Sequence, residues 1–122
     1  MSDSKGEYSE ASRKYIVNDV VNNITDRDRY NRSKDREAKY NENWKENSVN
    51  LNDIVKKFAP NGRTYNDGVK FVFEGDKYSV IADMPSGYCR IRENSTDKYL
   101  KLDGTYGKDK DTHFKIKRRE EM

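Results

Sequence analysis

The sequence predicts an α+β domain in which N-terminal helices pack on one face of a four- to five-stranded antiparallel sheet. Residues 1–46 contain no proline and only one glycine, Gly6, and their apolar residues recur with helical spacing. From Val69 onward apolar and polar residues alternate, and short turn signals separate the runs. Helices followed by a run of strands are typical of α+β proteins, in which the helices cover one face of the sheet.

Two helices are expected before residue 48. The first is amphipathic and about four turns long, and its apolar stripe consists of Tyr15, Ile16, Val17, Val20, Val21 and Ile24. Thr25 and Asp28 form a capping-box-like start for the second, which covers residues 25–47. This second segment is polar nearly all round, and Tyr40 and Trp44 are its main apolar pair. We interpret it as a solvated helix.

A third, short helix is predicted within residues 48–60. Ser48 or Asn50 can cap its start, and Pro60 ends it. Its apolar face consists of Leu51, Ile54, Val55 and Phe58. We therefore divide the chain into a helical N-terminal extension, residues 1–48, and an α+β domain, residues 49–122.

Five short strands are expected after a turn-rich segment at residues 61–68. They cover residues 69–74, 77–83, 87–93, 98–103 and 112–118. Few residues separate neighbouring strands, so antiparallel hairpins and meanders are the simplest connections. In the last three strands one set of alternate positions is apolar, and these side chains should meet the helices. They are Cys89, Ile91, Leu100, Leu102, Phe114 and Ile116.

The composition limits the class of protein. The chain has 122 residues and a formal net charge of +3, and 39% of its residues are charged against 32% hydrophobic. A chain this polar can bury only a modest core. No stretch approaches the roughly 20 apolar residues of a membrane span, so no membrane insertion is expected. Cys89 is the only cysteine, which rules out an internal disulfide.

The polar sides of the last three strands combine into one surface, which we call the basic face. Its members are Tyr88, Arg90, Arg92, Tyr99, Lys101, His113, Lys115 and Lys117. None of them is acidic, although the whole chain has 25 Lys and Arg against 22 Asp and Glu. An ordinary solvated sheet face explains the polarity but not the single sign of the charge. Cations together with tyrosines favour phosphate contacts and base stacking, and therefore RNA over duplex DNA. We expect RNA to contact Tyr88, Arg92, Tyr99, Lys101, Lys115 and Lys117.

His113 adds acid–base chemistry to this face, and it is the only histidine of the chain. An imidazole near its unperturbed pKa exchanges protons at neutral pH, and neighbouring cations favour the neutral form, which suits a base. Thr112 precedes it, and its hydroxyl can donate to a phosphate if a bulge or a strand end turns it inward. RNA supplies its own 2′-hydroxyl nucleophile, so cleavage needs only a proton acceptor, a proton donor and cations around the phosphate. No metal-binding or phosphate-binding glycine motif is present, so neither a metal nor a cofactor is expected.

Two segments resemble a known family: ADMPSGYCRIRENSTDKYLKLDG, residues 82–104, and THFKIKRREEM, residues 112–122. They are similar to the C-terminal ends of bacterial polymorphic and contact-dependent inhibition toxins. Those toxins belong to the barnase, EndoU, anticodon-cleaving colicin and RelE-like (BECR) ribonuclease superfamily. The resemblance covers residues 49–122, and its most specific parts are Ser86-Gly87-Tyr88, Arg90, Leu102-Asp103-Gly104 and residues 112–116.

The resemblance implies helices packed on a four- or five-stranded sheet, with the RNA site on the open sheet face. It implies metal-independent cleavage of RNA, often tRNA. Because the RNA supplies its own nucleophile, we expect a 2′,3′-cyclic phosphate at the product end. By position, Thr112 and His113 would be catalytic, and Arg90 with Lys115 would stabilise the phosphate. It also implies a cognate immunity protein as partner. Action in the bacterial cytoplasm, after secretion or delivery as part of a larger toxin, would follow.

Two other functions stay open from the sequence. The same face would serve a non-catalytic RNA-binding module, or a protein-interaction domain that binds an acidic partner such as an immunity protein. Loss of cleavage with retained binding after substitution of His113 would separate the enzyme from the binding module. The salt dependence of RNA binding would separate both from the protein-interaction domain.

Overall fold

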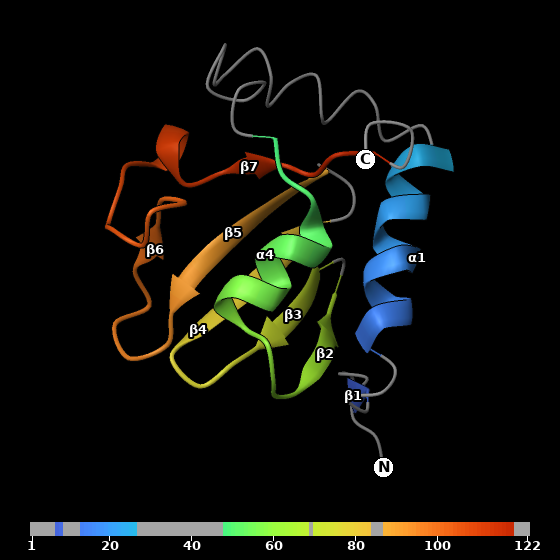
Figure 1. Ribbon diagram of the computed structural model, residues 1–122, viewed down its shortest axis with the longest axis horizontal. Coiled ribbons are helices and arrows are strands. Elements are labelled where there is room, and N and C mark those ends of the chain that lie inside the picture. The colour runs from blue at the N-terminus through green and yellow to red at the C-terminus, as the bar shows by residue number, and fades with distance from the viewer. Residues whose placement is uncertain (1–6, 9–12, 27–47, 69, 84–86, 119–122) are drawn as a thin grey trace.

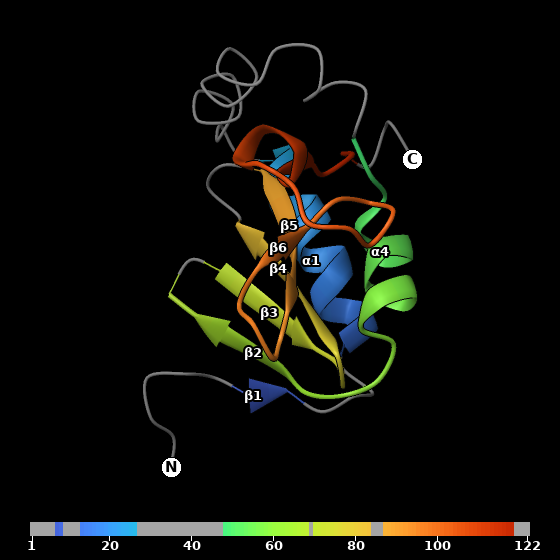
Figure 2. The same cartoon turned by 90° about the vertical axis from the view of Figure 1, so that its left-hand side faces the viewer.

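The computed structural model describes residues 7–8, 13–26, 48–68, 70–83 and 87–118 of the chain. Within these residues two α-helices, α1 (Arg13–Asp26) and α4 (Leu51–Phe58), accompany an antiparallel sheet of seven strands (Figure 1). Both helices pack on the same face of the sheet (Figure 2). The predicted α+β class is therefore confirmed. The helix expected at residues 25–47, with Tyr40 and Trp44, lies outside the described residues from residue 27 onward.

The sheet is a meander in which two short strands pair with the same edge of a longer strand. Its strands are β1 (Glu7–Tyr8), β2 (Thr64–Asp67), β3 (Lys70–Glu74), β4 (Tyr78–Asp83), β5 (Tyr88–Glu93), β6 (Tyr99–Leu100) and β7 (Phe114–Lys115). They pair in the order β1 to β6, and β7 also pairs with β5. One edge of β5 thus carries β7 beside its first two residues and β6 beside its fourth and fifth. Because they share that edge, β6 and β7 are shorter than the strands expected at 98–103 and 112–118.

The sheet also has two more strands than expected, β1 and β2. Residues 61–68 were expected to be a turn, but Thr64–Asp67 pairs with Lys70 to Phe73. Chain reversals remain at the two ends of that segment, where Gly62 has a φ of 122° and Gly68 a φ of 67°. Thr and Tyr at the start of β2 favour strands, so the turn residues that follow end the strand rather than prevent it.

The alternation expected in the last three strands is confirmed. Val80, Ile91 and Leu100 face one another across three strands on the helix side. Cys89 and Phe114 pair in the same way, and Ile116 is fully buried in the same core. Leu102 is only partly buried but packs against this core. Lys115, the residue after Phe114, lies opposite Tyr88 on the other face. A register shift of one residue would have exchanged the two faces.

Helix α4 follows its predicted boundaries. Asn50 is the N-cap, and its side-chain oxygen accepts a hydrogen bond of 3.2 Å from the backbone N–H of Asp53. The helix ends at Phe58, and the N–H of Ala59 still donates to the carbonyl oxygen of Val55 before Pro60. Its predicted apolar side chains, Leu51, Ile54, Val55 and Phe58, are all buried.

Helix α1 belongs to the same core as the sheet. Ile16, Val17, Val20 and Val21 are buried in one cluster with α4, Phe73 and Phe114. The expected division at residue 48 therefore separates segments that share a core. We treat α1, α4 and the sheet as one folded unit.

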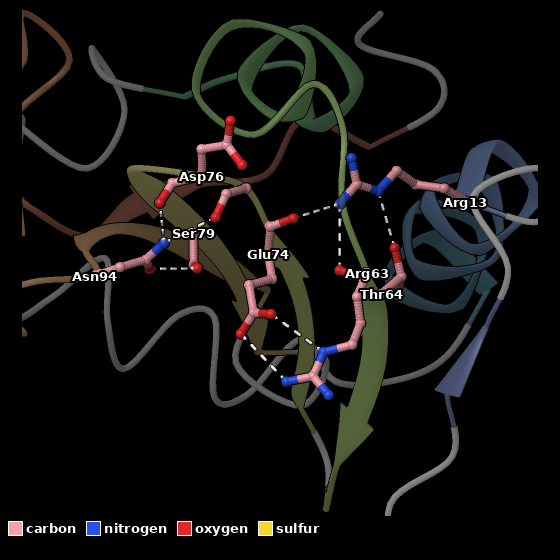
Figure 3. A network of polar contacts seen from close by, with 8 residues as sticks. Arg13, Arg63, Thr64, Glu74, Asp76, Ser79 and Asn94 are labelled. Carbon is pink, nitrogen blue, oxygen red and sulfur yellow. Dashed lines mark hydrogen bonds and ion pairs between the residues drawn. The ribbon is translucent and has the colours of Figure 1, made fainter.

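Arg13, at the start of α1, is a buried arginine that links the helix to the sheet (Figure 3). Its guanidinium donates to the hydroxyl of Thr64 at 2.9 Å and to the carbonyl oxygens of Ala59, Arg63 and Glu74. These acceptors lie on the C-cap of α4 and at the paired ends of β2 and β3. One side chain thereby satisfies polar backbone groups from three elements.

Candidate functional site

Arg90 is the centre of the candidate site. It lies in β5 between the residues that pair with β7 and those that pair with β6, and its side chain is on the face away from the helices. Its Nη2 donates to the hydroxyl of Thr112 at 3.0 Å, and its Nε to the carbonyl oxygen of Thr112 at 3.3 Å. Its guanidinium carbon lies 3.4 Å from the centre of the Tyr99 ring. Arg90 thus ties together β5, β6 and the segment before β7.

That segment is a 3₁₀ helix, η2 (Asp109–Asp111), followed by Thr112. Thr112 is fully buried, and its hydroxyl lies 3.1 Å from the carbonyl oxygen of Lys108. The backbone at Gly107 passes close to the side chains of Lys101 and Thr112. A Cβ there would lie 2.6 Å from Cγ of Lys101 and 3.1 Å from Cγ2 of Thr112. The loop therefore brings the stem of Lys101 next to Thr112.

His113 sits between this loop and β5. Its Nδ1 is 2.7 Å from the carbonyl oxygen of Asp109. Its ring meets the Tyr88 ring edge to face, with 4.7 Å between the ring centres. Only 6% of the residue is exposed. The imidazole is consequently held by contacts on two sides rather than projecting from the sheet.

Burial of His113 and Tyr88 corrects the prediction that they lie on an open surface, and Thr112 is buried as well. The alternation places His113 and Tyr88 on the predicted face, but both residues are buried there and their rings pack against each other. Tyr88, which is 6% exposed, offers no open ring to a base and instead packs on His113. The guanidinium of Arg90 stacks on one face of the Tyr99 ring, so that face is not available to a base.

The positive charge of the basic face is partly offset by carboxylates from turns. Asp109 lies 3.6 Å from Nη2 of Arg90, and Asp97 lies 3.8 Å from Nε of Arg92. Both carboxylates are largely exposed, so these ion pairs are weak in water. Asp83 is buried on the same face, opposite Tyr88 in the neighbouring strand. Carboxylates therefore lie beside both arginines of the basic face, which the alternation of the sequence did not indicate.

The lysines of the basic face differ from its arginines in their ion pairing. Lys101, Lys115 and Lys117 are half-buried and form no ion pair within the described part of the chain. Lys115 lies opposite Tyr88, and the backbone N–H of Lys117 donates to the carbonyl oxygen of Val49. Together with Arg90, these lysines are the cations from which an anion-binding role for this face can be argued.

The structure brings five predicted residues together in two contacting groups. Arg90 contacts Thr112 and Tyr99, and Tyr88 contacts His113, the residue after Thr112. Arg92 lies farther along β5, opposite Tyr99. The sequence did not identify Asp109 or Gly107, because a turn residue's backbone contacts leave no periodic signal.

Other groups in the described residues offer no second site. Burial raises the pKa of the Cys89 thiol to about 12, so the thiol stays protonated and behaves as a small apolar side chain. No cluster of three or more His, Cys, Asp or Glu suited to a metal ion occurs among the residues that the structure describes. Nor does any described helix have the length and apolar character needed to cross a membrane.

Comparisons with known proteins leave the family of this chain a prediction. Searches against models of protein families, curated proteins and solved structures find no significant match. The resemblance to the BECR ribonucleases therefore depends on the two sequence segments and their residues. The α+β fold and the contacts around Arg90 are the structural observations from which a function can be argued.

Proposed function

We propose that this protein is a metal-independent endoribonuclease whose active site contains His113 and Arg90. The observation that supports this most is the convergence of an imidazole, a guanidinium and a hydroxyl at one end of the sheet. Arg90 and Thr112 are 22 residues apart in the chain, yet two hydrogen bonds join them. His113, next to Thr112, contacts β5 through Tyr88.

These groups match the needs of RNA cleavage. The 2′-hydroxyl attacks the adjacent phosphorus when a base removes its proton, and an acid protonates the leaving 5′-oxygen. His113 is the group suited to this proton exchange at neutral pH. The phosphate gains negative charge on its non-bridging oxygens in the transition state, and a guanidinium stabilises that charge.

Arg90 retains donors for such a phosphate. The contacts with Thr112 use Nε and Nη2, and Asp109 also lies beside Nη2. Among the described residues, Nη1 has no hydrogen-bond partner. Since a guanidinium carries five N–H groups, the two on Nη1 remain for phosphate oxygens while the others fix its position.

Lys101, Lys115 and Lys117 would hold the flanking RNA phosphates. Replacing Lys117 with alanine should weaken RNA binding at low salt with little effect on the fold. Each lost phosphate contact lowers the slope of log affinity against log salt by about 0.7–0.9. Fluorescence anisotropy with a labelled RNA between low and moderate salt would measure this slope.

Lys56→Ala is the matched control, since Lys56 is an exposed lysine on α4, the helix side of the sheet. It should leave the slope unchanged. Equal slopes for the wild type and both variants would exclude Lys117 from the RNA interface.

Burial of His113 favours a second candidate, a non-catalytic RNA-binding module. A general base has to reach the proton that it removes, and only 6% of His113 is exposed. In that case Arg90 and His113 stabilise the β6–β7 connection, and the lysines alone bind RNA. Binding that depends on salt, without cleavage, is the result that this candidate predicts.

The test of the proposal is incubation of the full chain with total bacterial RNA in the presence of EDTA. We expect discrete fragments whose 3′ ends carry a 2′,3′-cyclic phosphate. Intact RNA, or cleavage that appears only after Mg²⁺ is added, would refute the proposed activity. The toxin role and the immunity partner implied by the resemblance depend on the same outcome.

A further inference from the structure

The contact between His113 and Asp109 determines where the imidazole carries its proton. A carbonyl oxygen only accepts hydrogen bonds, so at 2.7 Å from Nδ1 it requires a proton on that nitrogen. Nδ1 is then protonated in both the neutral and the charged ring. Nε2 is consequently the nitrogen that gains and loses a proton.

The Asp109 carbonyl is itself fixed by the turn around Thr112. The backbone N–H of Thr112 donates to it at 3.2 Å, and the N–H of Asp111 donates to the carbonyl oxygen of Lys108 at 2.9 Å. The hydroxyl of Thr112 bonds to the same Lys108 carbonyl at 3.1 Å. These bonds close the 3₁₀ turn that presents the Asp109 carbonyl to the ring.

The Thr112 hydroxyl is fully engaged within the protein. Its proton points to the Lys108 carbonyl, and its oxygen accepts from Nη2 of Arg90 at 3.0 Å. The residue is fully buried. A phosphate therefore meets neither its proton nor its oxygen, in contrast to the catalytic role that the resemblance implies.

We propose that Thr112 is a positioning residue, whose hydroxyl joins Arg90 to the 3₁₀ turn that holds His113 with its proton on Nδ1. Nε2 is then the nitrogen that exchanges its proton, and Arg90 and the imidazole are both tied to the turn around Thr112. The tautomer is a property of the fold alone. The exchange of a proton between Nε2 and RNA rests on the proposed function.

The sole histidine makes this directly measurable. Nitrogen-15 NMR of the full chain with labelled imidazole, recorded above the pH at which the ring becomes neutral, distinguishes the two tautomers. The wild type should show one form, with Nδ1 protonated, whereas a solvated imidazole favours the proton on Nε2. A wild-type ring protonated on Nε2 would overturn the proposal without any variant.

Two variants test the part played by the hydroxyl. Thr112→Val keeps the shape and removes the hydrogen bonds, so a second tautomer should appear and kcat for RNA cleavage should fall about 10–100-fold, with KM little changed. Thr112→Ser restores the hydroxyl and should restore both readouts. A Thr112→Val protein that keeps the single Nδ1–H tautomer contradicts the positioning role.

The outcomes also separate this inference from the proposed function. A wild-type protein with the Nδ1–H tautomer but no cleavage of RNA would refute the ribonuclease and leave the positioning role intact. Cleavage that is lost in both Thr112→Val and Thr112→Ser, with an unchanged tautomer, would instead overturn the positioning role and keep the ribonuclease.

Discussion

Replacing His113 with asparagine is expected to lower the rate of RNA cleavage about 10²–10⁴-fold, the usual contribution of a general acid–base group. The asparagine amide N–H can still donate to the Asp109 carbonyl, which now accepts from Nδ1 at 2.7 Å. It cannot exchange a proton at neutral pH. Single-turnover cleavage of a labelled RNA measures the effect on the chemical step.

This variant needs a stability control because His113 is buried and packs on Tyr88. Thermal unfolding should remain cooperative, and RNA affinity should stay near the wild-type value, since the lysines supply the phosphate contacts. A folded His113→Asn protein that cleaves RNA at the wild-type rate would show that this imidazole is not the acid–base group.

Replacing Arg13 with methionine should be the most destabilising single change in the network of Figure 3. Methionine fills part of the volume but leaves the Thr64 hydroxyl and the carbonyls of Ala59 and Glu74 without this donor. Each buried acceptor left without a hydrogen bond costs about 1–3 kcal/mol, and several lose their donor at once. The free energy of unfolding of a small domain is only about 5–15 kcal/mol in total. The urea concentration at the midpoint of unfolding should therefore fall substantially.

Arg63→Met is the matched control. Arg63 is an arginine of the same network, and it pairs with Glu74 at 3.1 Å, but its side chain is 51% exposed. An exposed ion pair contributes about 1 kcal/mol or less. If both variants lose the same stability, the buried position of Arg13 has no special importance.

The periodic features of the fold could be predicted from the sequence. Helix α4 follows from its four apolar positions, the cap at Asn50 and Pro60 after its end. The two faces of β5 and β7 follow from strict alternation, with Phe114 inside and Lys115 outside. Each of these signals lies within a few residues and needs no partner from elsewhere in the chain.

Features that depend on distant contacts could not be predicted in this way. Alternation assigns His113 to a face, but it does not say whether the residue is buried there. The loop before β7 brings Gly107 close to Lys101 and the Thr112 hydroxyl to Arg90, 22 residues away in the chain. None of these has a periodic pattern.

The burial of Arg13, unlike that of His113, is indicated by its position in the sequence. Arg13 precedes Ile16 by three residues, Val17 by four and Val20 by seven, which places it on the apolar stripe of α1. A charged residue on that stripe indicates a buried polar network. The apolar residues of the same stripe pack against the sheet and α4.

The most direct test of the proposed mechanism uses two matched RNA oligonucleotides in EDTA. One is all RNA, and the other carries a single 2′-deoxy nucleotide on the 5′ side of the bond that the protein cuts. Because RNA supplies the nucleophile in this mechanism, the first should be cut to a 2′,3′-cyclic phosphate, identified by mass spectrometry, and the second should stay intact at that bond. Cleavage of the deoxy-substituted bond, or no cleavage of either oligonucleotide, would contradict the account.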